Sequence, residues 1–142
     1  MNIAAILSSK GSDVVTVACD TPVREAVGLL AEHRIGAVPV MKKDKVVGIM
    51  SERDVIYCLR RDGASMLDWP VEKVMTTPII TAAPDMPVLA GLSLMTERRI
   101  RHLPVVDGGR LVGLVSIGDL VKYRMDRIEE EAAALRDDIQ TA

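Results

Sequence analysis

Two short motifs in this sequence place a carboxylate three residues after a serine. They are Ser51-Glu52-Arg53-Asp54 and Ser116-Ile117-Gly118-Asp119. At the start of a helix such a pair can cap the first turn, because the serine oxygen accepts a backbone N–H and the acid lies near the positive end of the helix dipole. The same pair could bind a nucleotide, since a carboxylate can accept both hydroxyls of a ribose and a helix N-terminus favours a phosphate. The two roles are compatible, and the spacing leaves both open.

A basic cluster, Arg98-Arg99-Ile100-Arg101-His102, is the second feature that could do chemistry. Arg98 and Arg99 fall at the end of a predicted helix, where cations complement the helix dipole. Arg101 and His102 come after that helix, immediately before a predicted strand. A guanidinium group can bind a phosphate with two parallel hydrogen bonds, and a histidine can add a donor. The cluster therefore predicts a phosphate site, with an ordinary surface role as the alternative.

The elements that must position these motifs are duplicated. Residues 14–57 and 79–122 align without a gap when the sequence is shifted by 65 positions. Identical pairs include Pro22/Pro87, Pro39/Pro104, Gly48/Gly113 and Asp54/Asp119. Such self-similarity is the signature of a repeated structural unit. Arg101 and His102 replace Gly36 and Ala37 of the first copy, so the basic cluster is the sharpest difference between the copies.

Each copy is predicted to fold as strand, helix, strand, strand and helix. In the first copy, short apolar runs at 14–17, 38–41 and 46–50 predict the strands. Pro22 precedes apolar residues at helical spacing, and a second helix is expected from Ser51 to Gly63. A repeat of this size would bury too little surface by itself. We therefore expect an α+β protein in which two pseudo-symmetric β-α-β-β-α motifs pack together around one shared core.

The predicted order is an N-terminal helix (1–13), the first motif (14–63), a connecting helix interrupted at Pro70 (64–78), the second motif (79–122) and an acidic C-terminal helix (123–142). This last segment carries three arginines against six acidic residues. Apolar residues at alternating spacings of four and three give it the heptad pattern of a coiled coil. They are Val121, Met125, Ile128, Ala132, Leu135 and Ile139. A dimer contact is favoured, and packing back onto the same chain is the alternative.

Two glycines, Gly48 and Gly113, interrupt predicted strands. Glycine destabilises a strand and usually marks a bulge or the close approach of other atoms. A ligand passing over the strand would explain both glycines, and so would tight packing of the sister repeat. The sequence favours neither explanation.

Composition excludes several classes of protein. The 142 residues include three aromatic side chains and carry a formal charge of −2, so base stacking and the positive surface of a nucleic-acid binder are not expected. No apolar run approaches the length of a membrane span. Cys19 and Cys58 are too few for a disulfide framework, and we expect a cytoplasmic protein. No catalytic triad, P-loop, dinucleotide glycine fingerprint or metal-ligand cluster is found, so an enzyme is not expected.

The duplicated unit resembles the cystathionine-β-synthase (CBS) domain pair, also called a Bateman module. The residues that carry the resemblance are Val38-Pro39-Val40 and Val47-Gly48-Ile49-Met50-Ser51-Glu52-Arg53-Asp54, with Leu103-Pro104-Val105 and Val112-Gly113-Leu114-Val115-Ser116-Ile117-Gly118-Asp119 in the second copy. The chain is most similar to the small bacterial stand-alone pairs, which have no attached enzyme or transporter. The resemblance implies an adenosine-containing ligand in clefts between the repeats, and flat, disc-like dimers.

The resemblance also implies two unequal clefts and the residues that form them. The first cleft would take Thr16, Thr21, Ile35, Gly36 and Ala37 from the first copy, with Arg101, His102, Ser116 and Asp119 from the second. The second cleft would use Thr81, Ile100, Ser51, Arg53 and Asp54. The first is preferred, because it combines two candidate phosphate ligands with an acid for the ribose. Adenine would lie between aliphatic side chains such as Ile35 and Val38, and Leu103 and Pro104 complete the predicted set.

We therefore expect a regulatory module that binds AMP in the first place, with ATP, ADP, NAD and S-adenosylmethionine as further candidates, and that needs no metal to fold. Ligand binding would change the cleft or the packing of a homodimer, and a regulated partner protein would respond to that change. A structural dimerisation protein with vestigial clefts is one alternative. A nucleotide hydrolase is the other.

Overall fold

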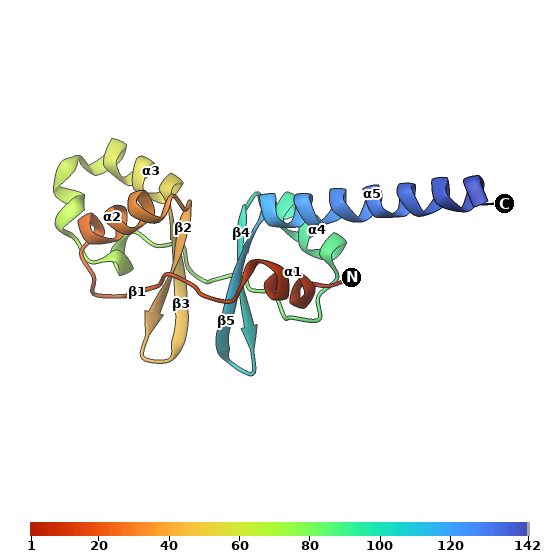
Figure 1. Ribbon diagram of the computed structural model, residues 1–142. Helices are drawn as coiled ribbons and strands as arrows, with labels where there is room; N and C mark the ends of the chain where they lie inside the picture. Colours follow the sequence, from red (N-terminus) through yellow and green to blue (C-terminus); the bar gives the residue numbers. More distant parts are fainter. Residues whose placement is uncertain (142) are drawn as a thin grey trace.

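The computed structural model describes residues 1–141, which form two repeats placed next to each other with a β-hairpin of each at the centre (Figure 1). The first repeat contains β1 (Val17–Ala18), α2 (Val23–His33), β2 (Ala37–Lys42), β3 (Lys45–Ser51) and α3 (Glu52–Asp62). The second contains α4 (Val88–Arg98), β4 (His102–Asp107), β5 (Arg110–Ser116) and α5 (Ile117–Thr141). A short helix, α1 (Ile3–Lys10), precedes them. The predicted α+β fold with flanking helices is confirmed.

The two hairpins are built to the same plan. In each, antiparallel strands pair along their whole length, and the register shifts at matching positions, after Val40 in β2 and after Val105 in β4. In the first repeat β1 adds a parallel strand through Val17 and Ala18. In the second repeat this strand shrinks to a single bridge between Ala82 and Val105.

The shorter first strand of the second repeat corrects the sequence prediction. Ala82 donates to the Pro104 carbonyl over 2.9 Å and accepts from the Val106 N–H over 2.9 Å, and the pairing goes no further. Pro78 and Pro84 flank this segment and have no N–H to donate to a ladder. Ile79 and Ile80, which precede the bridge, line a cavity between the repeats instead.

The helices begin and end where local chemistry predicts. Pro22 and Pro87 come directly before α2 and α4, with φ of −60° and −61° that suits a helix start. Both helices end on an arginine in the left-handed conformation, Arg34 and Arg99. Helix α3 starts at a Ser51 cap and stops at Gly63, whose φ is +80°. The connecting segment forms two 3₁₀ helices, η1 (Ala64–Asp68) and η2 (Val71–Lys73), separated at Trp69 and Pro70.

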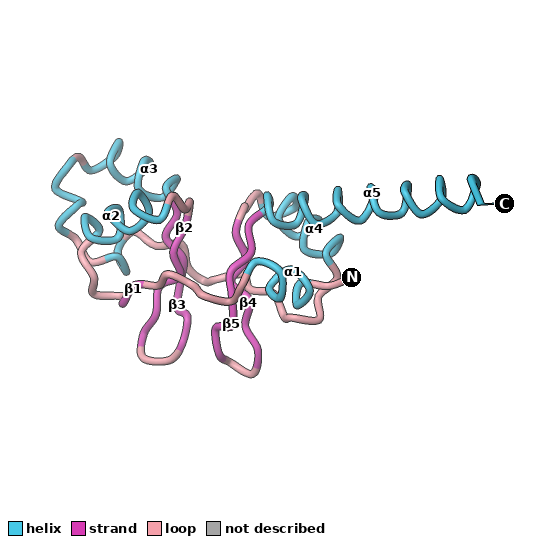
Figure 2. The backbone as a smooth tube through the Cα atoms, viewed as in Figure 1, coloured by secondary structure: helices cyan, strands magenta, loops and turns pink. Residues whose placement is uncertain are grey.

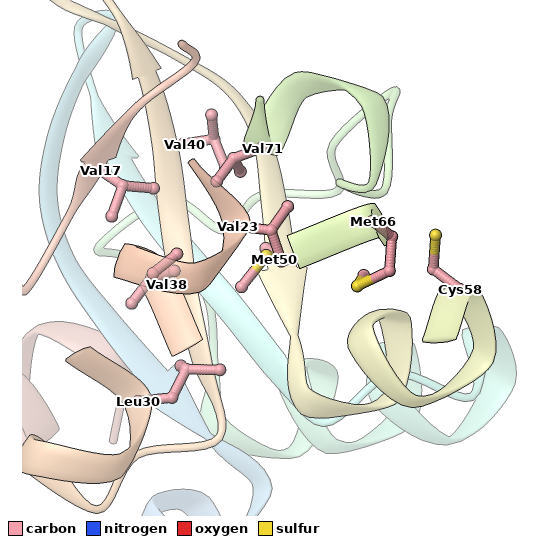
Figure 3. Packing of buried hydrophobic residues seen from close by; sticks show 10 residues of the cluster. Val17, Val23, Leu30, Val38, Val40, Met50, Cys58, Met66 and Val71 are labelled. Carbon is pink, nitrogen blue, oxygen red and sulfur yellow. The ribbon is translucent and has the colours of Figure 1, made fainter. Parts of the chain in front are cut away.

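Each repeat has a hydrophobic core of its own. Figure 3 shows the first core, where Val38, Val40 and Met50 of the hairpin meet α2 and the connecting segment through Val23, Met66 and Val71. The second core gathers buried residues of α1, α4, β4, β5 and α5. The expectation of one shared core is therefore wrong. Helices cover the outer side of each hairpin, and the repeats meet mainly where β3 and β5 run side by side.

A non-repeated segment packs over the same strand position in each repeat. A Cβ added to Gly48 of β3 would lie 2.5 Å from the Met75 sulfur, and one added to Gly113 of β5 would lie 2.5 Å from a Leu7 methyl group. Close packing therefore explains both glycines, although the neighbour is neither a ligand nor the sister repeat. Helix α1 thus packs over the strand glycine of the second repeat, as the linker packs over the strand glycine of the first.

The C-terminal segment is continuous with the second repeat. Helix α5 runs for 25 residues without a break at the expected boundary between residues 122 and 123. Its C-terminal half extends beyond the rest of the molecule (Figure 2), and Leu135 and Ile139 are 64% and 77% exposed. Packing of this stripe back onto its own chain is therefore excluded. Among residues 1–141, none of the helices has the combination of length and apolar character needed to cross a membrane.

Candidate functional site

A cavity of about 220 Å³ lies between the two repeats, at the N-terminus of α3. Its walls come from the start of α3, the linker before the second repeat, and the loop between α4 and β4. The lining residues are Gly36, Ile49, Ser51, Glu52, Arg53, Asp54, Thr76, Pro78, Ile79, Ile80, Arg99, Ile100, Arg101 and His102. The cavity thus joins both repeats, as an inter-repeat binding site must.

Ser51 and Asp54 form a complete capping box at one end of this cavity. The Asp54 N–H donates to the Ser51 hydroxyl over 3.2 Å, and the Ser51 N–H donates to Asp54 Oδ2 over 2.9 Å. The other carboxylate oxygen, Oδ1, accepts from the Thr76 hydroxyl over 2.9 Å. Among residues 1–141, the hydrogen-bond partners of Asp54 are uncharged and its carboxylate is in no ion pair. The cap positions the carboxylate and leaves it able to accept from a ligand hydroxyl.

The opposite wall is set by the contact between His102 and Gly36. The His102 ring lies 3.1 Å from where a Cβ of Gly36 would be, and the Gly36 carbonyl accepts from the Glu52 N–H over 3.0 Å. These contacts join the loop before β4 to the start of α3. Burial lowers the pKa of His102, although the carboxylates of Glu52 and Asp119 act in the opposite direction. His102 is therefore a neutral donor or acceptor at pH 7 and not a fixed cation.

The remaining lining divides into a charged part and an apolar part. The charged part includes three arginines, Arg53, Arg99 and Arg101, and two acidic residues, Glu52 and Asp54. An excess of guanidinium groups suits a phosphate. The apolar wall consists of Ile49, Ile79, Ile80, Ile100 and Pro78. A flat apolar ring, a polyol and an anion could each find a matching surface in this one cavity.

The corresponding motif of the second repeat is bound by the chain itself. Ser116 and Asp119 make the same backbone hydrogen bonds as Ser51 and Asp54, at 2.8 and 3.1 Å. The Lys10 ammonium group of α1, however, donates to Asp119 Oδ2 over 2.7 Å and to the Leu114 carbonyl over 2.9 Å. Burial by itself would raise the pKa of Asp119, but hydrogen bonds from Lys10 and Ser116 and the charge of Lys10 hold that pKa below its usual value.

The structure brings together seven of the residues singled out in the sequence. They are Gly36, Ser51, Arg53, Asp54, Ile100, Arg101 and His102. The grouping of these residues differs from the expected one. Arg101 and His102 line this cavity beside Ser51 and Asp54, because the loop before β4 packs on Gly36 and the start of α3. Ser116 and Asp119 are outside the cavity lining, although His102 pairs with Ser116 across β4 and β5.

The other predicted residues lie elsewhere. Thr16 lines a separate open groove near the hairpin turns, beside Lys43 and Arg110. Thr21, Ile35 and Thr81 are outside the cavity lining. Four more belong to the strands and are buried beneath the surface, namely Ala37, Val38, Leu103 and Pro104. Because Val38 has no exposed surface, the expectation that adenine packs between Ile35 and Val38 is wrong for this cavity.

Seven lining residues were not predicted as site residues. They are Ile49, Glu52, Thr76, Pro78, Ile79, Ile80 and Arg99. Ile49, Glu52 and Arg99 stand next to predicted positions and could have been found by widening each motif by one or two residues. The linker residues Thr76, Pro78, Ile79 and Ile80 carry one signal, a short apolar run after a proline.

The described residues offer no site for a resident metal ion. Within residues 1–141, no three histidine, cysteine, aspartate or glutamate side chains lie close enough to hold one. The cavity groups that could contact a ligand are a carboxylate, hydroxyls, guanidinium groups and one imidazole. These are groups that bind organic anions and polyols by hydrogen bonds.

Comparison with known proteins agrees with this architecture. The chain matches the CBS domain over residues 5–61 and again over residues 71–126. It is similar to the CBS-domain containing protein ATU1752 from Agrobacterium tumefaciens, with 39% identity, a TM-score of 0.84, and coverage of 87% of this chain and 99% of that one.

Two further solved structures hold ligands. The CBS domain pair of protein MJ0100, in complex with 5′-methylthioadenosine and S-adenosyl-L-methionine, is 27% identical, has a TM-score of 0.79, and is matched over 89% of this chain and 98% of its own. CBSX2, in complex with AMP, is 25% identical with a TM-score of 0.70, covering 80% of this chain and 89% of that one. Both matches, like the two family matches along the chain, span the repeats described above. The chain therefore belongs to the CBS domain family, as a tandem pair of repeats.

Proposed function

We propose that this chain is a regulatory module that binds an adenine nucleotide in the cavity at the start of α3. One observation carries the proposal. A single cavity between the repeats combines a capped carboxylate, three guanidinium groups and a wall of isoleucines. Ribose, phosphate and adenine need these three surfaces, and adenosine-containing ligands occupy the similar proteins MJ0100 and CBSX2.

Each part of the ligand has a suitable partner. Asp54 would accept the ribose hydroxyls, because its carboxylate has no cationic partner. Arg101, Arg53 and Arg99 would bind the phosphate, and His102 would add a hydrogen bond in its neutral form. Adenine would lie against Ile79, Ile80 and Ile100, and backbone groups would recognise it because no phenylalanine, tyrosine or tryptophan is among the lining residues.

AMP is the proposed ligand of first choice. A cavity of about 220 Å³ lies below the range of about 300–1,000 Å³ that is typical for small-molecule sites. A mononucleotide with its phosphate near the mouth fits that space better than a dinucleotide such as NAD. ADP and ATP would place further phosphates in solvent beside the arginines, whereas S-adenosylmethionine would bring a cation toward them.

The proposed role is regulatory and does not include catalysis. A ligand that bridges both repeats would favour one relative placement of them, and a partner protein that contacts the molecule would respond to that change. The proposal includes a homodimer as the assembly in which the change is transmitted. It also includes a cytoplasmic location, where adenine nucleotides are available and where the free thiols of Cys19 and Cys58 stay reduced.

Isothermal titration calorimetry of the purified protein tests the proposal. We expect AMP to bind more tightly than adenosine, and the same titration with ADP, ATP, NAD and S-adenosylmethionine ranks the alternatives. Arg101→Ala should remove most of the difference between AMP and adenosine, whereas Arg98→Ala, one turn away and outside the cavity, should preserve it. Silence for every adenosine-containing ligand would overturn the proposal and leave the structural dimerisation protein as the better reading.

A further inference from the structure

Helix α5 leaves the body of the protein after its first two turns. Leu120 is fully buried in the second core and Tyr123 packs against that core. A helix of 25 residues is about 37 Å long at 1.5 Å per residue, and its C-terminal half projects past every other element (Figures 1 and 2). A helix this polar and this exposed gains little from its own chain beyond the second turn.

The projecting helix carries an apolar stripe along one side. Val121, Met125, Ile128, Leu135 and Ile139 are between 42% and 77% exposed, and half-buried Ala132 fills the remaining place in the pattern. Their spacing puts Val121, Ile128 and Leu135 at heptad position d, and Met125, Ala132 and Ile139 at position a. The body-facing residues Leu120 and Tyr123 then fall at positions c and f, on the opposite side of the helix. The fold therefore turns the stripe away from its own body.

The charges beside the stripe select an orientation for a second helix. In this heptad, Arg124 and Glu131 occupy position g, and Glu129 and Arg136 occupy position e. In a parallel coiled coil each g residue faces the e residue five positions later on the other helix. Arg124 would therefore face Glu129 of the second copy, and Glu131 would face Arg136 of the second copy. Every such pair joins opposite charges.

An antiparallel arrangement is disfavoured by the same residues. When the stripes of two antiparallel copies overlap fully, Glu129 faces Glu129 of the second copy and Glu131 faces Glu131 of the second copy. Lys122 and Arg136 are also brought opposite each other, and only Arg124 gains an opposite charge, that of Asp138 of the second copy. Like charges at these flanking positions oppose pairing, which is how such positions choose partner and orientation.

We propose that α5 forms a parallel, two-stranded coiled coil with α5 of a second copy of this chain, in register from Val121 to Ile139. The contact rests on the homodimer proposed above but not on nucleotide binding, because it lies outside the cavity. With about two and a half heptads, the coil is short, so the dimer dissociates on dilution. The parallel arrangement places both bodies at the same end of the coil.

Analytical ultracentrifugation of the full-length protein over a range of concentrations tests this surface. The wild type should be a dimer that dissociates on dilution, and the double variant Ile128→Glu, Leu135→Glu should be monomeric. Ala134→Glu, on the solvent side of the same helix, should remain dimeric and controls for added charge. A wild type that stays monomeric at its solubility limit, or a double variant that stays dimeric, would overturn the proposal. A monomeric wild type with the stripe intact would assign the stripe to another protein.

Charge reversal tests the orientation. Arg136→Glu should weaken the parallel dimer about ten-fold or more, because it faces Glu131 of the second copy, and adding Glu131→Lys should restore it. In the antiparallel arrangement Arg136→Glu would instead strengthen the dimer, since it would face Lys122. Calorimetry with AMP on the monomeric double variant separates the two proposals. Retained AMP binding with lost dimerisation supports both proposals and shows that they are independent. Lost dimerisation together with silence for AMP in the wild type supports the coil alone, and a variant that stays dimeric and still binds AMP supports the nucleotide site alone.

Discussion

The two Ser-x-x-Asp motifs occupy equivalent places, yet the structure treats them differently. In both repeats the motif caps a helix, and a non-repeated segment packs over a glycine on the preceding strand. In the first repeat that segment supplies the Thr76 hydroxyl to Asp54. In the second it supplies the Lys10 ammonium group to Asp119. A neutral donor leaves the carboxylate available to a ligand, whereas a cation already occupies it.

The difference shows how a duplicated unit can acquire one specialised site. The repeats themselves keep the same cap and the same strand register. The segments outside the repeats decide which carboxylate is exposed to a cavity. Arg101 and His102, which have no basic counterpart in the first copy, strengthen the same choice by lining the cavity beside Asp54.

The largest expected effect comes from exchanging each acid for its amide. Asp54→Asn should weaken AMP binding about 10- to 100-fold, the equivalent of about 1.5–3 kcal/mol for a hydrogen bond to a charged acceptor. The same change at Asp119 should alter the affinity by no more than about two-fold, because Lys10 already holds that carboxylate. Calorimetry of both variants measures the contrast. Equal losses would mean that the two motifs serve the ligand alike.

Gly48→Ala and Gly113→Ala should lower the free energy of unfolding by different amounts. A Cβ at Gly48 would lie 2.5 Å from the Met75 sulfur and 3.0 Å from the Thr76 carbonyl oxygen, which is backbone. The three atoms nearest to a Cβ at Gly113 all belong to the Leu7 side chain, the closest at 2.5 Å, and a leucine end can rotate away. Overpacking costs about 1–3 kcal/mol, so we expect Gly48→Ala near the top of that range and Gly113→Ala near the bottom.

Urea unfolding of the two glycine variants gives the comparison, and AMP titration adds a second readout. Gly48→Ala should also weaken AMP binding, because displacement of Thr76 disturbs the partner of Asp54. Gly113→Ala should leave AMP binding intact. Identical unfolding free energies for the two variants would show that the linker yields as readily as the Leu7 side chain.

The repeated elements could be predicted from the sequence because their signals are local. The cap at Ser51, the stop at Gly63 and the alternating apolar runs of the hairpins all lie within a few residues of what they determine. The first strand of each repeat was the exception. In the first repeat it covers Val17–Ala18 and not the expected residues 14–17, and in the second it is a single bridge at Ala82. In the second repeat, the flanking prolines cannot donate to a strand ladder and the isoleucines before Ala82 line the cavity, so local β propensity does not decide the structure.

Half of the residues that line the candidate site could be predicted from the sequence, but their arrangement could not. Ser51, Asp54, Arg101 and His102 carried recognisable chemistry, and the structure brings them together. Lys10 gave no signal, because it lies 109 positions from Asp119 and outside the repeat. A long-range contact between a non-repeated segment and a repeat leaves no periodic trace in a single sequence.

Removing the ammonium group of Lys10 should make the two Ser-x-x-Asp motifs more alike in their ability to bind AMP. Lys10→Met keeps the apolar stem of the side chain but frees Asp119, so a second AMP should bind and the calorimetric stoichiometry should rise from one toward two. The pair is partly exposed, at 39% and 26%, so its loss should lower the unfolding free energy by less than about 1 kcal/mol. Lys45→Met, at the exposed start of β3, controls for a lost surface charge. An unchanged stoichiometry would show that α1 itself, and not its lysine, blocks the second motif.

The same variant should change the response to acid. With Lys10 present, the lowered pKa of Asp119 adds stability above the ordinary pKa of an aspartate, and this stability disappears as the pH falls through the lowered value. Without Lys10, only the hydrogen bonds with Ser116 oppose the effect of burial on the pKa of Asp119, so the depression of that pKa and the stability it adds should both be smaller. Unfolding free energies measured between about pH 3 and about pH 6 report the change, because an aspartate titrates in this range.

The smallest expected effect concerns His102, whose pKa responds to the charges of Glu52 in the first motif and Asp119 in the second. Burial lowers its pKa, so the unfolded chain binds more protons than the folded one between the lowered value and the ordinary value of about 6.5. The stability from His102 is therefore complete above about pH 6.5 and decreases as the pH falls below it. Urea unfolding between about pH 5.5 and 7.5 should show this slope in the wild type and lose it in His102→Gln, with His33→Gln on the exposed surface of α2 as the control. The charge of Lys10 helps to lower the pKa of His102, so Lys10→Met should reduce the slope of stability against pH. An unchanged slope in Lys10→Met would show that His102 is electrostatically separate from the second motif.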